Sequence, residues 1–161
     1  KTKWFQHHYL QVKDNETLTS LFSKLLEDKG IVTHKNLSII VESIKERATF
    51  VSDLWEQGSF FFEAPAAYDE KASKAFKEGT SELMSEVLGL LNECDEFTSD
   101  EISNKVKGWL TSQEIGFGKV MMPLRLSLVG EMKGPDVFDI AAILGKEETI
   151  SRIKKTISFL S

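Results

Sequence analysis

The chain has 161 residues and a formal net charge of −5 at pH 7, and 41% of its residues are hydrophobic. That length fits one domain or two small ones, and the hydrophobic share is ordinary for a globular protein. The acidic balance argues against a protein that coats nucleic acid non-specifically, but it leaves room for a local basic face that reads a few bases.

The sequence contains no membrane segment and no disulfide framework. No apolar run reaches the roughly 20 residues that span a bilayer, and no secretory signal opens the chain. The single cysteine, Cys94, excludes an internal disulfide and fits a reducing compartment. A reducing compartment favours the cytoplasm. The chain starts at Lys1 and not at Met, so we expect a fragment of a longer protein.

Helical patterns fill the first half of the chain. The aromatic stretch Trp4–Gln11 is expected to be a short helix. Asn15 is expected to cap a helix that runs to about Lys29 and ends at Gly30. Its apolar stripe comprises Leu18, Leu21, Phe22, Leu25 and Leu26.

A second helix is predicted from Lys35 or Asn36 to Leu54, because apolar residues recur at helical spacing. Arg47 stands where that stripe requires an apolar residue. Arg47 is therefore either a snorkelling or ion-paired structural arginine, or a guanidinium that the core holds in place to face a ligand.

The stretch from Gly58 to Asp69 interrupts the helical pattern. It contains three consecutive phenylalanines, Phe60–Phe62, and Pro65 stops any helix before it. We expect a packed hinge between two helical halves, at residues 1–67 and 68–161, with base stacking by the phenylalanines as the less favoured alternative.

The second half is again helical. Short helices are expected over residues 70–77 and 80–94, the second with Cys94 as a small core hydrophobe. Thr98 and Glu101 are expected to form a capping box at the start of the next helix. The last helix should carry Ile150, Ile153, Ile157 and Leu160 on one side and a basic face of Arg152, Lys154 and Lys155 on the other, most simply a solvated face.

Between these helices, the apolar run Gly118–Gly130 carries one embedded cation, Arg125. The run is predicted to be a helix with Pro123 in its first turn, where the missing N–H is tolerated. Alternating leucines make a short strand the competing interpretation. Gly134-Pro135 should start the following helix, which Gly145 should close.

The sequence offers no recognisable catalytic chemistry. It has no phosphate-cradling glycine loop, since Gly116-Phe117-Gly118-Lys119 lacks both the spacing and a preceding strand. Its three histidines and one cysteine lack metal-ligand spacing. We therefore expect a recognition module with no catalytic or metal-binding residues.

Several pieces together resemble one family. Lys3–Leu10 resembles the segment after the catalytic half of bacterial glutamyl-tRNA synthetases, and Glu46–Thr49 with the three phenylalanines and Tyr68-Asp69 resembles the family's helix and hinge. The strongest similarity comprises Met122–Leu126 through Gly130, Gly134-Pro135, Ile143–Glu147 and Arg152. Their order and spacing cover nearly the whole chain.

The resemblance implies an all-α, monomeric, anticodon-binding region of two small helical subdomains that binds tRNA(Glu). The parent enzyme, a class I glutamate–tRNA ligase, would use ATP and magnesium on a catalytic Rossmann-type domain. The signature motifs of that domain are missing from this sequence, so the chain should bind tRNA without cofactor and without aminoacylating it.

By position, the resemblance assigns Arg47 to the third anticodon base. It assigns Arg125, with Gly134, Pro135 and Val137 at the next helix start, to a pocket for the first two bases. Two alternatives remain open from the residues alone: a helical protein-interaction module without RNA binding, and an autonomous small enzyme.

Overall fold

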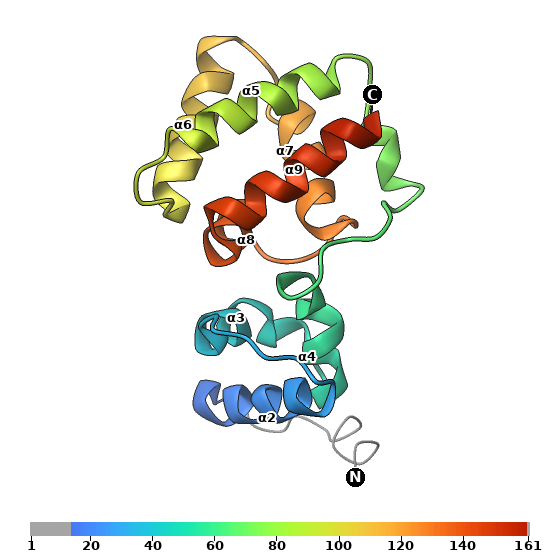
Figure 1. The fold of residues 1–161 in the computed structure, drawn as a ribbon, viewed down its shortest axis with the longest axis vertical. Helices are drawn as coiled ribbons and strands as arrows, with labels where there is room; N and C mark the ends of the chain where they lie inside the picture. The colour runs from blue at the N-terminus through green and yellow to red at the C-terminus, as the bar shows by residue number, and fades with distance from the viewer. Residues whose placement is uncertain (1–13, 161) are drawn as a thin grey trace. The chain divides into compact units, whose positions relative to one another are not determined.

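The computed structural model describes residues 14–160, and within that range every regular element is an α-helix or a 3₁₀ helix (Figure 1). The expected all-α fold is confirmed. The chain divides into two compact units, one up to Glu63 and one from Ala64 onward. The subdomain ranges 1–67 and 68–161 stay a prediction, and the expected helix at Trp4–Gln11 lies outside the described residues.

From residue 14 onward, the first unit contains three α-helices that pack on one another. They are α2 (Asn15–Asp28), α3 (Leu37–Ile44) and α4 (Val51–Gly58), and two 3₁₀ turns, η1 (Lys45–Arg47) and η2 (Ser59–Phe61), follow α3 and α4. The α2 stripe is buried as predicted except for Leu21, which is partly exposed. The cap is Asp14 and not Asn15, because the Asp14 carboxylate accepts the Thr17 N–H at 3.0 Å.

The predicted single helix from residue 35 or 36 to residue 54 is wrong. Asn36 caps its start as expected, but α3 ends at Ile44 and α4 begins at Val51. The break has a local cause: the Asp53 carboxylate accepts the N–H groups of Thr49 and Phe50, at 2.8 and 2.9 Å, and so holds an extended entry into α4.

The three phenylalanines pack inside the first unit. Phe60 is 3% exposed and Phe61 is fully buried. The Phe62 ring lies edge-on to Phe22 at 5.8 Å and stacks with Trp55 at 6.3 Å. The packing interpretation therefore holds: Phe60 and Phe61 are core residues, and the partly exposed Phe62 packs on two rings of the same unit.

Over residues 64–160, the second unit contains five α-helices. They are α5 (Thr80–Asn92), α6 (Ser99–Ser112), α7 (Gly118–Val129), α8 (Val137–Leu144) and α9 (Lys146–Leu160), preceded by η3 (Ala72–Ala75). Helix α9 packs against α5 and α7, and α6 packs against α5 and α8 (Figure 1). The predicted helix at 70–77 is only the short 3₁₀ turn η3.

Half of the predicted capping box forms at the start of α6. The Thr98 hydroxyl accepts the Glu101 N–H at 3.2 Å. The Glu101 carboxylate does not return to the N–H of Thr98 but accepts those of Asp95, Glu96 and Phe97, at 2.8 to 2.9 Å. It therefore orders the loop before the helix, where Phe97 has a φ of 54°.

The apolar run is a helix, as predicted, and the strand alternative is wrong. Pro123, however, lies inside α7 and not in its first turn. An internal proline removes one helical hydrogen bond. Burial offsets that loss, because the run from Pro123 to Val129 is buried at every position except Arg125.

Gly130 ends α7 in the left-handed conformation, with φ of 87°. A Cβ atom there would lie 2.6 Å from the Pro65 Cβ and 3.0 Å from the Ala67 carbonyl oxygen. The Gly130 carbonyl accepts the Asp69 N–H at 2.8 Å. The close approach of residues 65–69 therefore requires glycine at this position.

Candidate nucleic-acid interface

Arg47 lies on the surface of the first unit, at the end of η1. Its Nη1 donates to the Ser43 carbonyl at 3.3 Å. The prediction that the apolar stripe holds its stem in the core is wrong, because the chain leaves helical geometry at Ala48, which is extended (φ −107°, ψ 134°) and only 3% exposed. Ala48 takes the core position that an unbroken helix would have given to Arg47.

The turn therefore presents a cation and an aromatic ring to solvent. Arg47 is exposed, and three residues later Phe50 is 40% exposed. The Asp53 bonds to Thr49 and Phe50 hold the backbone between them. Exposed arginine and aromatic groups on a fixed turn are the groups with which proteins bind splayed bases of single-stranded RNA.

Arg125 in the second unit binds the backbone of the loop that follows α7. Its Nη1 lies 2.9 Å from the Lys133 carbonyl, 3.3 Å from that of Gly134 and 2.7 Å from that of Pro135. The side chain is half-buried. Arg125 therefore holds this loop through its backbone carbonyls.

The loop presents backbone at the start of α8. Gly134 has a φ of 99° and, like Pro135, is partly exposed. Asp136 caps α8 by accepting the Phe138 N–H at 2.8 Å. Val137 is only 5% exposed, so its side chain belongs to the core and only its backbone could meet a ligand. Arg125, Gly134 and Pro135 thus lie together, whereas Arg47 belongs to the other unit.

The sequence pattern also misplaced Arg152. Arg152 is not part of a solvated basic face on α9, since it is only 3% exposed. Its Nε donates to the Glu148 carboxylate at 2.7 Å, and its Nη1 donates to the Leu128 carbonyl at 2.7 Å. Glu148, four residues earlier, was the available signal, because a helical pair at this spacing directs an arginine along the helix.

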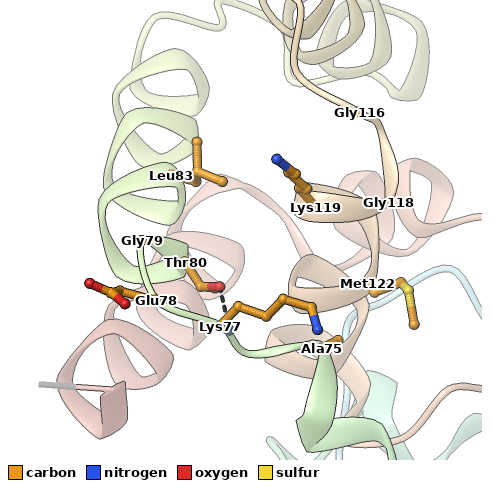
Figure 2. Close-up of a pocket in the computed structure, with 10 residues that line it drawn as sticks. All are labelled: Ala75, Lys77, Glu78, Gly79, Thr80, Leu83, Gly116, Gly118, Lys119 and Met122. Carbon is orange, nitrogen blue, oxygen red and sulfur yellow. Dashed lines mark hydrogen bonds between the residues drawn. The ribbon is translucent and has the colours of Figure 1, made fainter.

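A pocket that the sequence did not predict lies between the starts of α5 and α7. Its volume is about 690 Å³. Figure 2 shows Lys77 extending from the loop before α5 towards α7, and Lys119 pointing from α7 towards α5. Leu83 and Met122 supply apolar wall. The sequence pattern showed that Gly118-Lys119 does not belong to a phosphate-binding glycine loop. In the structure, these two residues form one side of this pocket.

Across residues 14–160, no three histidine, cysteine, aspartate or glutamate side chains gather as metal ligands. Cys94 is 2% exposed, as expected of a core hydrophobe, and burial raises the pKa of its thiol, which disfavours the reactive thiolate. No helix of this part of the chain is long and apolar enough to cross a membrane.

The chain resembles known proteins along nearly its whole length. A family model described as an anticodon binding domain matches residues 8–157. The chain is 54% identical to the glutamate–tRNA ligases of Christiangramia forsetii and Flavobacterium johnsoniae, and each alignment covers 99% of this chain and 32% of the relative. The chain thus spans about a third of the length of the curated relatives it matches.

Solved structures agree with this similarity. A crystal structure of a glutamate tRNA ligase from Elizabethkingia meningosepticum, in complex with its amino acid, matches with a TM-score of 0.88 and 46% identity, over 99% of this chain and 32% of that one. The glutamate-tRNA synthetase of Elizabethkingia anophelis matches with a TM-score of 0.80 and 42% identity, over 98% of this chain and 31% of that one.

Proposed function

The chain belongs to the anticodon binding domain family, and on that premise we propose that it reads the anticodon of tRNA(Glu) as the RNA-binding part of a glutamate–tRNA ligase. The whole enzyme would join glutamate to tRNA(Glu) in the cytoplasm, with ATP and magnesium bound by a catalytic domain outside this chain. The chain itself would act as a monomer and need no cofactor to bind RNA.

One observation carries the assignment of the site: the Arg125 guanidinium holds the carbonyls of Lys133 and Pro135 at 2.9 and 2.7 Å. These bonds fix a partly exposed loop at the start of α8 before any ligand arrives. A prearranged loop loses little conformational entropy when it binds. The loop would offer the backbone of Gly134 and Val137 and the ring of Pro135 to the first two anticodon bases.

Arg47 would read the third base. The anticodons for glutamate and glutamine differ there, with C in the first and G in the second. Arginine carries five donors and no acceptor, so it can bond the acceptors on the pairing edge of cytosine. A guanine in the same place is larger and presents N–H donors to a group that cannot accept them. The comparisons give no support to a protein-interaction module.

A binding titration tests the proposal. The 161-residue chain should bind a tRNA(Glu) transcript in fluorescence anisotropy and bind a tRNA(Gln) transcript more weakly. The acidic net charge of −5 implies few phosphate contacts, about 2 to 4, each adding roughly 0.7 to 0.9 to the slope of log affinity against log salt. Equal affinity for the two transcripts would contradict anticodon reading by this chain.

A further inference from the structure

The pocket between α5 and α7 concentrates positive charge in an acidic chain. Lys77 and Lys119 both line it, and across residues 14–160 neither ammonium group forms an ion pair. Glu78 also lines the pocket, but Figure 2 shows its carboxylate directed away from both lysines. The local charge therefore favours an anion, in contrast to the net charge of −5.

The helix starts add to this preference. Gly79 and Thr80 begin α5, Gly118 and Lys119 begin α7, and all four residues line the pocket. Neither helix has a side-chain cap, whereas α2, α3, α6 and α8 are capped by a carboxylate, amide or hydroxyl oxygen. Helix starts carry partial positive charge that stabilises anions.

The pocket walls can also contact an apolar group attached to the anion. Leu83 from α5 and Met122 from α7 give the pocket an apolar surface beside the two lysines. A volume of about 690 Å³ accommodates a group of small-molecule size. A phosphate joined to a ribose and a base matches both parts, since the sugar and base can pack on leucine and methionine.

Helix α7 contributes both to the pocket, through Lys119 and Met122, and to the loop site, through Arg125. Met122 and Arg125 are three residues apart on α7, so they are neighbours on one side of that helix. Lys119 and Arg125 are six residues apart, a rise of about 9 Å along the helix. A strand whose bases reach the Arg125 loop would bring a neighbouring nucleotide near the pocket.

We propose that the pocket lined by Lys77, Leu83, Lys119 and Met122 binds one phosphate-bearing nucleotide of the tRNA, next to the bases at the Arg125 loop. This inference rests on the proposed function and adds a contact to it. The contact supplies affinity through the phosphate and carries no discrimination between anticodons, because neither lysine reads a base edge.

Removing the two charges tests the phosphate contact. Lys77→Gln/Lys119→Gln should weaken tRNA(Glu) binding about fivefold to tenfold and lower the salt slope by about 1, with the tRNA(Glu) to tRNA(Gln) ratio unchanged. Lys154→Gln/Lys155→Gln removes the same charge from exposed positions on α9 and should change affinity much less. Equal effects of the two double variants would overturn the proposal.

A second variant blocks the pocket without endangering the fold. A Cβ atom at Gly118 meets nothing within 4 Å, and an acidic residue in the first turn of a helix is stabilising. Gly118→Glu should therefore keep the melting temperature and weaken tRNA(Glu) binding about tenfold. Gly108→Glu is the matched control, because that exposed α6 position is equally open. Unchanged affinity of Gly118→Glu would overturn the proposal.

A separate measurement distinguishes a phosphate of the tRNA from the phosphate of a free nucleotide as the ligand of the pocket. AMP, titrated into the chain and followed by NMR, should shift the amide signals of Lys77 and Lys119 only at high concentration, while tRNA(Glu) shifts them at its own dissociation constant. Tight AMP binding with tRNA affinity unaffected by the lysine variants would assign the pocket to a free nucleotide and overturn the RNA contact. A wild-type chain that fails to bind tRNA(Glu) would contradict the proposed function, and the AMP titration would still test the pocket.

Discussion

Arg47 in the first unit lies exposed on a 3₁₀ turn, whereas Arg125 and Arg152 in the second unit donate to backbone carbonyls on either side of Gly130. Arg152 binds the Leu128 carbonyl in the last turn of α7, and Arg125 binds the loop that follows. Carbonyls at a helix end have no partner within the helix. The second unit therefore uses buried or half-buried arginines to satisfy and position backbone, whereas the Arg47 guanidinium lies at the surface and donates to the Ser43 carbonyl four residues earlier.

The comparison predicts the largest loss of stability for Arg152. Arg152→Met should lower the free energy of unfolding by about 2 to 4 kcal/mol, because it leaves the buried Leu128 carbonyl without that donor. Lys154→Met removes the same charge from an exposed position of α9 and should change stability by less than about 0.5 kcal/mol. Urea unfolding measures both. Similar midpoints for the two variants would contradict a structural role for Arg152.

Arg125 should show an intermediate loss, combined with an effect on RNA. Arg125→Ala should cost about 1 to 3 kcal/mol of stability, because the loop carbonyls lose a charged donor. It should also weaken tRNA(Glu) binding, because residues 133–135 are no longer held. Arg125→Lys keeps the charge but not the planar guanidinium, and should restore little of either property. A lower melting temperature with unchanged affinity per folded molecule would leave Arg125 a purely structural residue.

Acid should destabilise both units through their capping carboxylates. Bonds from the N–H groups of Asp95, Phe97 and Glu96 hold the pKa of Glu101 below its ordinary value, and the bond from Thr17 does the same for the pKa of Asp14. A carboxyl group whose pKa is lower in the folded chain than in the unfolded chain stabilises the fold. This stabilisation is fully present at a pH above the unfolded-state pKa and is lost as the pH falls through the folded-state pKa.

The melting temperature should therefore fall as the pH drops below the ordinary value of 4.5 for Glu101. Glu101→Gln should be less stable than the wild type at neutral pH, and the difference should shrink in acid. Asp14→Asn should behave in the same way, with a smaller change because fewer N–H groups bond Asp14. A difference that stays constant with pH would contradict this account of the two carboxylates.

The smallest effect on stability should come from Arg47. Arg47→Gln should change the free energy of unfolding by less than about 0.5 kcal/mol, because the side chain is exposed. Ala48→Gln places the same side chain one position later, in the core, and should cost about 1 to 3 kcal/mol. Thermal melts distinguish the two. A large loss from Arg47→Gln alone would show that the turn depends on its arginine.

Apolar periodicity predicted the helices well, because core-facing residues determine where a helix packs. It failed between Ile44 and Val51, where the Asp53 carboxylate binds two backbone N–H groups and interrupts the helix. A side chain that bonds backbone N–H groups can end a helix without changing the spacing of the apolar residues. The helical pattern in the sequence therefore continues across the break in the structure. The same limit placed Arg47 in the core. Pro123 was expected in a first turn because proline favours that position, whereas α7 begins five residues earlier, at Gly118.

The candidate site was predicted less completely. The resemblance pointed to Arg125, Gly134 and Pro135, which the structure brings together, but no pattern showed that Arg125 bonds the loop's own carbonyls. Arg152 was assigned to a polar face because helical spacing shows only which residues share a face of one helix. It does not show that Arg152 donates to the Leu128 carbonyl of another helix, α7. The pocket between α5 and α7 is lined by residues from two helix starts that are far apart in the sequence and adjacent in the fold, so no sequence pattern predicted it.

Base selectivity at Arg47 tests the central claim most directly. Two anticodon stem-loops that differ only in having C or G at the third anticodon base are titrated with the wild-type chain and with Arg47→Gln. The wild type should prefer C by about tenfold, because cytosine offers acceptors to the Arg47 guanidinium, whereas guanine presents N–H donors that the guanidinium cannot accept. Glutamine offers both a donor and an acceptor, so the variant should bind the two stem-loops with similar affinity. A preference for C that survives in a normally folded Arg47→Gln chain would contradict the account.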